Sequence, residues 1–172
     1  MAEYRRRREY NCSGNSTMIE HVWTVLCHRS VVDGETNNIS LIDVLERIGI
    51  SLPPERATTL LQSDASGAQQ RLMIPLSFEV VTLWKRVSLQ EPAHGKGRLV
   101  LIGPDASELA VAREFEVDLT SHARLRSRAR LSGIPLTTAG EYRFRTELLI
   151  DGEANWRQVG TTPFEVVFQA ES

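Results

Sequence analysis

Four arginines at alternate positions make residues 123–131 the segment of this chain best equipped to bind an anion. The segment contains Arg124, Arg126, Arg128 and Arg130. In an extended strand, alternate side chains share one face and lie about 6.6–6.8 Å apart. A row of guanidinium groups with this spacing suits phosphate, nucleic acid or an acidic partner. These four arginines are therefore the candidate interaction stripe.

An acidic segment just upstream offers these arginines partners within the chain. It carries three carboxylates at alternate positions, and residues 120–122 form a loop short enough for a hairpin. The hairpin would produce three cross-strand pairs, Asp118–Arg124, Glu116–Arg126 and Glu114–Arg128. Each pair would contribute about 0.2–1 kcal/mol to stability. We favour this ladder, with a free binding stripe as the alternative. Arginines neutralised in this way make a poor nucleic-acid site.

The other reactive side chains form no recognisable catalytic or metal-binding motif. The four histidines, at positions 21, 28, 94 and 122, include no pair at metal-ligand spacing. Cys27 and His28 are adjacent, so in a strand their side chains point to opposite faces. Asp43 and Glu46 lack a neighbouring histidine or second acid. The sequence therefore predicts neither an enzyme nor a cofactor or metal site.

Two further basic segments are weaker candidates for anion binding. His94-Gly-Lys-Gly97 resembles a fragment of a phosphate loop, but it lacks the required glycine spacing and the Ser or Thr after lysine. We therefore expect a hairpin turn there. Arg5-Arg-Arg-Arg8 lies in a polar segment and, with four charges alone, would bind nucleic acid weakly. We expect residues 1–17 to form a disordered, solvated tail.

The elements that must position these residues are strands. A chain of 172 residues, 41% hydrophobic and 24% charged, suits one soluble domain, which we place at residues 18–172. The clearest alternation, from Leu72 to Trp84, predicts one long strand. Other strands are predicted at 19–27, 98–102, 111–119 and 123–131. Eight or nine strands with little helix favour an antiparallel β-sandwich.

Residues 39–50 carry two conflicting patterns. Their apolar residues sit at helical spacing, Ser40 could cap a helix, and Gly49 could end it. The segment is short for a helix, however, and its surroundings are strands. The family resemblance described below favours a strand here.

The segment 139–153 indicates an immunoglobulin-like arrangement. It contains a turn, a strand with Tyr142 and Phe144 on one face, and an Asp151-Gly152 turn before a return strand. Immunoglobulin-like sandwiches place a tyrosine at such a corner, two residues before a buried position that is cysteine in antibodies. Here that position is Phe144, so the corner is predicted without the disulfide.

The chain resembles an uncharacterised bacterial family of small immunoglobulin-like β-sandwich proteins, defined by a domain of unknown function. The matching blocks are Leu26-Cys-His28 followed by residues 39–48, residues 99–105, residues 140–144 and Asp151-Gly152. The resemblance covers about Met18 to Phe168. His28 departs from the family's usual aspartate, and residues 51–70 form a longer insert. The resemblance implies the fold and names no functional residue.

These observations together predict a non-catalytic protein-binding or assembly module, self-association included, that makes contacts through sheet edges or loops. The alternative is a small-molecule or carbohydrate-binding domain that serves a separate enzyme, which solvent-facing tryptophans would favour. A net charge of −2 argues against nucleic acid, and no apolar run is long enough to span a membrane. Cys12 in the polar tail and Cys27 in an apolar strand indicate a reducing, cytoplasmic setting, and the family resemblance implies a bacterial one.

Overall fold

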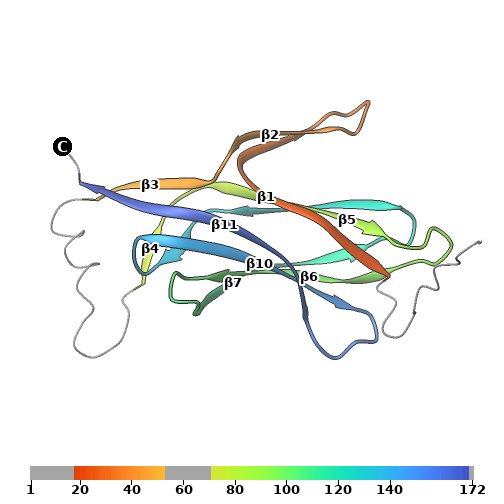
Figure 1. The fold of residues 1–172 in the computed structure, drawn as a ribbon. Helices are drawn as coiled ribbons and strands as arrows, with labels where there is room; N and C mark the ends of the chain where they lie inside the picture. Colours follow the sequence, from red (N-terminus) through yellow and green to blue (C-terminus); the bar gives the residue numbers. More distant parts are fainter. Residues whose placement is uncertain (1–17, 53–70, 171–172) are drawn as a thin grey trace, which may run out of the picture.

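The chain folds into strands joined by turns (Figure 1). The computed structural model describes residues 18–52 and 71–170, and eleven strands occur in these two ranges. They form a four-stranded sheet A, a five-stranded sheet B and a two-stranded ribbon. The all-β class is confirmed, with more strands than the eight or nine predicted. The predicted tail, residues 1–17, lies outside the described residues.

Sheet A has the strand order β2-β1-β5-β8, and its neighbours pair antiparallel. Its strands are β1 (Ile19–Val32), β2 (Ile39–Val44), β5 (Phe78–Arg86) and β8 (Arg124–Leu131). The long strand β1 changes partner along its length: residues 19–27 pair with β5, and residues 27–32 pair with β2. Residues 28–44, here named the β1–β2 arm, therefore leave the body of the sheet as a hairpin, seen at the top of Figure 1.

Sheet B has the order β3-β11-β10-β6-β7. Its strands are β3 (Arg47–Leu52), β11 (Arg157–Ala170), β10 (Gly140–Ile150), β6 (His94–Ile102) and β7 (Glu108–Asp118). Neighbours pair antiparallel except β3 and β11, which run parallel. The sheets are thus antiparallel and mixed, and the parallel pair β3–β11 is a departure from the mostly antiparallel β-sandwich that the sequence predicted.

The long strand predicted from Leu72 to Trp84 is divided in two. β4 (Leu72–Ile74) pairs with β9 (Ile134–Leu136) in the ribbon, while β5 begins at Phe78 in sheet A. Pro75 follows β4 directly and has no backbone N–H for a ladder. The alternation of apolar residues continues through this break, so the pattern alone could not reveal it.

Residues 39–50 form strands, as the resemblance favoured, but in two different sheets. β2 belongs to sheet A and β3 to sheet B. Between them, the Leu45 N–H donates to Leu26 of β1 at 2.9 Å, and the Glu46 carbonyl accepts from Glu165 of β11 at 2.8 Å. The chain therefore changes sheet between two consecutive residues. Because the inward-facing side of the chain changes with the sheet, apolar residues fall out of strict alternation and mimic helical spacing.

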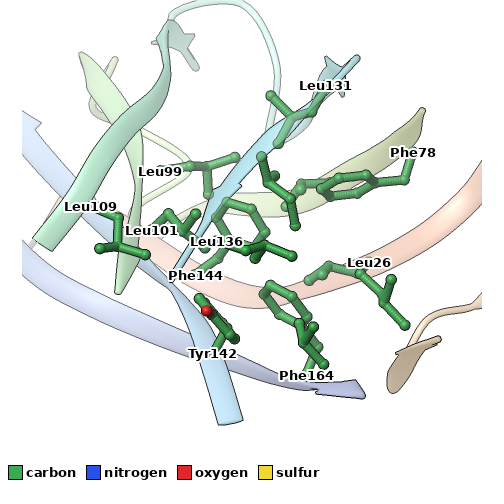
Figure 2. Packing of buried hydrophobic residues seen from close by; sticks show 14 of the residues in the cluster. Leu26, Phe78, Leu99, Leu101, Leu109, Leu131, Leu136, Tyr142, Phe144 and Phe164 are labelled. Atoms are coloured by element: carbon green, nitrogen blue, oxygen red, sulfur yellow. The ribbon is translucent and has the colours of Figure 1, made fainter. Parts of the chain in front are cut away.

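The main hydrophobic core is built from both sheets. Phe78 on β5 approaches Phe144 on β10 with ring centroids 6.1 Å apart, and Phe144 stacks on Phe164 of β11 at 5.6 Å. Figure 2 shows these rings with leucines of both sheets around them. Burying each such side chain contributes about 1.5–3 kcal/mol. This shared core holds the two sheets together and leaves each with one outward face.

The predicted corner at Tyr142 forms. The buried Tyr142 hydroxyl accepts the N–H groups of Thr137 at 2.9 Å and Thr138 at 3.1 Å, and it donates to the Thr138 carbonyl at 2.6 Å. Phe144, two residues on, is fully buried. The hydroxyl thus ties the turn before β10 to the strand itself.

The hairpin turn predicted at residues 94–97 is wrong, because these residues begin strand β6. The two glycines allow close packing within sheet B. A Cβ at Gly97 would lie 2.3 Å from the Phe115 ring, and one at Gly95 would lie 2.6 Å from the Leu149 carbonyl oxygen. The glycines therefore reflect crowding inside a strand, which a turn-based interpretation misses.

Candidate binding face

The predicted ladder between the acidic segment and the arginines is wrong. The acidic strand β7 pairs with β6 in sheet B, whereas the arginine strand β8 pairs with β5 in sheet A. The Leu119 N–H still donates to Ala93 beside β6, and the Ala123 carbonyl already accepts from Arg86 of β5. Residues 119–123 therefore cross from one sheet to the other, and β7 and β8 do not form a hairpin.

The carboxylates of β7 find their partners elsewhere. In the β6–β7 register Glu116 lies opposite Lys96, with 3.9 Å between the charged atoms, and its other oxygen lies 3.5 Å from His94. Asp118 accepts hydrogen bonds from the Thr120 N–H and hydroxyl, and these lower the pKa of its carboxyl. These side chains therefore belong to the outer face of sheet B.

The outer face of sheet A is organised in rows that run across three strands. The register places four residue triplets side by side, Glu20–Lys85–Arg124, Trp23–Leu83–Arg126, Val25–Val81–Arg128 and Cys27–Glu79–Arg130. Arginines thus line the β8 side of this face, and the two central rows carry apolar side chains on β1 and β5. The predicted strand geometry of the four arginines is confirmed.

Arg130 differs from the other three arginines because it has a carboxylate partner. Its guanidinium donates to Glu79 Oε1 at 2.8 Å, and Glu79 Oε2 accepts from the Ser30 N–H at 2.8 Å and the Ser30 hydroxyl at 2.5 Å. Burial disfavours the charge on Glu79, but these bonds and the nearby Arg128 charge outweigh burial and lower its pKa to about 2. Arg130 is therefore structural and is removed from the candidate stripe.

The remaining arginine row consists of Arg124, Arg126 and Arg128. In the described part of the chain, none of the three forms an ion pair with a carboxylate at salt-bridge distance. The acids on the same face are already engaged, Glu20 with Lys85 at 3.1 Å and Glu79 with Arg130. The row therefore carries positive charge that the described residues leave uncompensated by a bonded acid.

The arginine row opens on a hollow of about 940 Å³ between the sheet and the β1–β2 arm. Its apolar part comes from Trp23, Val81, Leu83, Leu125 and two residues of the arm, and its polar part from the arginine row, His122 and the arm tip. Among these described lining residues no carboxylate occurs. An apolar floor with cationic walls suits a ligand that carries negative charge on an otherwise uncharged body.

The arm tip completes the hollow and was missed by sequence reasoning. Arg126 donates to the Asn37 carbonyl at 2.5 Å and also to its side-chain oxygen. Asn37 has a φ of 54°, and the turn before it is held by Asp33, whose carboxylate accepts from Glu35 and Thr36. Residues 33–38 are of the types that form turns. Their spacing does not predict a contact with a strand almost ninety positions later.

The tryptophans take three different roles. Trp84 is fully buried and donates to Ser127 Oγ at 3.1 Å. Trp156 lies under the Arg98 guanidinium, 4.3 Å from the ring centre, on sheet B. Only Trp23 of these three lines the hollow. The tryptophans therefore do not form a shared solvent-facing surface of the kind that would have favoured a sugar site.

The histidines and Cys27 do not converge on a reactive centre. His21 is half-buried against the edge of the Trp84 ring, and burial lowers its pKa. His94 bonds to Asp151 at 2.8 Å on sheet B, and this hydrogen bond raises its pKa. Cys27 is buried with a free thiol, whose pKa is raised by burial and by the charge of Glu79. Asp43 and Glu46 belong to the segment that changes sheet.

The described residues contain no group of three or more His, Cys, Asp or Glu side chains placed to hold a metal ion. They also contain no helix with the length and apolarity needed to cross a bilayer.

Comparisons with known proteins add little. No family model and no curated protein matches the sequence. Among solved structures, the chain is similar to the crystal structure of hemolymph type prophenoloxidase (proPOb) from crustacean, with a TM-score of 0.48 and 6% identity. The similarity covers 90% of this chain and 34% of that chain, so this chain spans about a third of its length. Neither fold nor function is inferred from it.

Proposed function

We propose that this chain is a non-catalytic binding module that captures a partner protein through an acidic segment. One observation carries the proposal: Arg124, Arg126 and Arg128 flank a hollow whose described lining contains no carboxylate. Arg98, Arg130 and Arg145 each contact a carboxylate. The arginine row has no carboxylate at salt-bridge distance in the described residues, so it can bind an acid supplied from outside.

The contact mode that suits this face is strand addition at β8. β8 is the end strand of sheet A among the described residues, so the N–H and C=O groups on its outer edge lack a neighbouring strand. An added segment would pair its backbone with that edge, and alternate side chains would point to the outer face. Acids at every second position would then lie beside the arginine row.

The fold and setting that we propose are an immunoglobulin-like β-sandwich in the bacterial cytoplasm. Two observations support the fold: the core shared by sheets A and B, and the Tyr142 hydroxyl bonded to the turn before its strand. The free thiol of Cys27 is compatible with a reducing compartment. This part of the proposal also relies on the family resemblance.

The test uses an eight-residue peptide of alternating Glu and Thr, with a Gln-for-Glu peptide as its control. We expect calorimetry at about 50 mM salt to detect binding of the acidic peptide, which should weaken as salt screens the charges. The triple variant Arg124→Ala, Arg126→Ala and Arg128→Ala should bind about tenfold or more weakly. A matched triple variant on sheet B, Arg47→Ala, Arg113→Ala and Arg143→Ala, should bind like the natural chain.

Two results would contradict the proposal. One is equal binding of the Gln peptide, which would show that the acids do not matter. The other is unchanged binding by the β8 triple variant, which would place the site elsewhere. Circular dichroism of both triple variants checks that each is folded.

A second candidate is a small-molecule or carbohydrate-binding domain that serves a separate enzyme. The hollow favours it, because about 940 Å³ lies within the range of ligand pockets and Trp23 offers an aromatic surface for a sugar ring. Titration of tryptophan fluorescence with glucuronic acid tests it, with glucose as the uncharged comparison. Saturable quenching that disappears in Trp23→Leu would favour this candidate over a peptide partner.

A further inference from the structure

The acidic strand β7 and the arginine strand β8 form the two ends of their sheets on the same side of the molecule. Among the described residues, β7 is the end strand of sheet B and β8 the end strand of sheet A. Their residues are in contact across the core, where Phe115 of β7 and Leu125 of β8 join one cluster of apolar side chains. One side of the molecule therefore presents an acidic edge in one sheet and a basic edge in the other.

We infer that the partner is a second copy of this chain, whose β7 adds to β8 while its β8 adds to β7. This inference rests on the proposed function, because the copy supplies the acidic segment that the arginine row binds. The acidic row, Glu114, Glu116 and Asp118, has the alternate spacing of the arginines. Both contacts in the pair are then the same contact, as two-fold symmetry requires.

The symmetry follows from the strand directions. Residues 119–123 join the end of β7 to the start of β8 across the two sheets, so these strands run in opposite directions. A two-fold axis parallel to the strands keeps the direction of every strand and exchanges the layer of sheet A with the layer of sheet B. It therefore continues sheet A of one copy into sheet B of the other with antiparallel pairing. It also brings the two outer faces level, which places acids beside arginines.

The competing two-fold arrangement is excluded by charge. An axis perpendicular to the sheets would pair β8 with β8 and β7 with β7. That would set the arginine row against itself and the acidic row against itself, and like charges directly opposite are destabilising. Charged edges thus block pairing of identical strands and leave the complementary pairing open.

The acidic row is exposed enough to take part. Glu114 is exposed, and the Glu116 side chain is 59% exposed despite its contacts with Lys96 and His94. Arg124 and Arg128 are also exposed. Along the acidic row the pairing therefore requires only a shift of long side chains. At the other end of β7 the Leu109 carbonyl already accepts from Arg71, so the pairing is confined to the acidic half of the strand.

The experiment combines two charge-reversed variants. One reverses β8, with Arg126→Glu and Arg128→Glu, and the other reverses β7, with Glu114→Arg and Glu116→Arg. By sedimentation, we expect the natural chain to form dimers that dissociate at high salt and each variant alone to be monomeric. The two variants mixed should form a heterodimer, because both of its edges are again complementary. Arg143→Glu, on the central strand β10, is the control and should dimerise normally.

Each outcome decides. A natural chain that stays monomeric at the highest soluble concentration overturns the inference. Reversed variants that still dimerise alone, or that fail to associate when mixed, overturn it too. If Glu116→Arg prevents folding by circular dichroism, Glu114→Arg alone replaces it in the mixture. A monomeric chain that still binds the acidic peptide would overturn the second-copy partner and leave the proposed function standing. A monomeric chain that binds no acidic peptide would overturn both.

Discussion

The outer faces of the two sheets differ in how many of their arginines are paired with carboxylates. On sheet B, Glu147 lies between Arg98 and Arg145, at 2.5 Å and 2.6 Å from their Nε atoms, and Arg145 also contacts Glu108. The Arg145 Nε–H is not aligned for a hydrogen bond to Glu147, so that contact is an ion pair. On sheet A, Glu79 engages one arginine, Arg130.

The difference indicates which arginines serve the fold. The sheet B arginines are 23% exposed and surround a nearly buried carboxylate, so they neutralise a charge that the fold has enclosed. The arginine row of sheet A has no such task in the described residues. Positive charge without an internal acid slightly disfavours the folded chain, so its presence fits a role in binding.

The largest expected effect comes from Glu147→Gln. Removal of this carboxylate leaves Arg98 and Arg145 facing each other with little solvent, and breaking a buried pair typically costs several kcal/mol. We expect the free energy of unfolding to fall by about 3–4 kcal/mol. Urea denaturation followed by circular dichroism measures it. A loss below about 1 kcal/mol would show that sheet B tolerates unpaired arginines as sheet A does.

The next effect is the pH dependence contributed by Glu79. Its pKa of about 2 lies below the ordinary value of 4.5, so its stabilisation is present above pH 4.5 and is lost as pH falls towards 2. The shift corresponds to about 2–3 kcal/mol after allowance for the exposed Arg130. Urea denaturation at pH 6 and at pH 2.5 should show this loss in the natural chain and a smaller loss in Glu79→Gln. Parallel pH curves for the two proteins would mean that Glu79 has an ordinary pKa.

The smallest effect separates one arginine of each face. Arg145→Ala should reduce the free energy of unfolding by about 1–2 kcal/mol, because it leaves Glu108 and Glu147 short of a partner. Arg124→Ala, on the exposed arginine row, should change it by less than about 0.5 kcal/mol. Thermal melts of the two variants, compared side by side, check the contrast. Equal losses would show that the row is as structural as the sheet B network.

The sequence predicted features that depend on neighbouring residues. The alternation of arginines placed them correctly on one strand face, and the Tyr142 corner formed because its hydrogen-bond partners lie within five residues. Strand β10, the Asp151-Gly152 turn and strand β11 likewise pair as a hairpin. For these features, the spacing of residues within one segment is enough to predict the structure.

Features that depend on which sheet a strand joins were not predictable from the same patterns. Residues 119–123 are short enough for a hairpin, yet they cross the core, and alternation in β7 and β8 is identical in both cases. The change of sheet at Leu45 and Glu46 was hidden for the same reason. The contact between Asn37 and Arg126 depends on the bend of a whole arm. Strand alternation specifies a face and not a neighbour.

The parallel pairing of β3 with β11 has a consequence for how the chain is made. Arg47 lies beside Glu165, so β3 cannot join sheet B until residues more than a hundred positions later have been made. During synthesis on the ribosome, β3 would emerge long before its partner and remain an unpaired strand. Pairing over such a distance closes a large loop, which slows folding and lengthens exposure to aggregation. A chain that lost residues 157–170 would lack the only strand that β3 pairs with in the described structure.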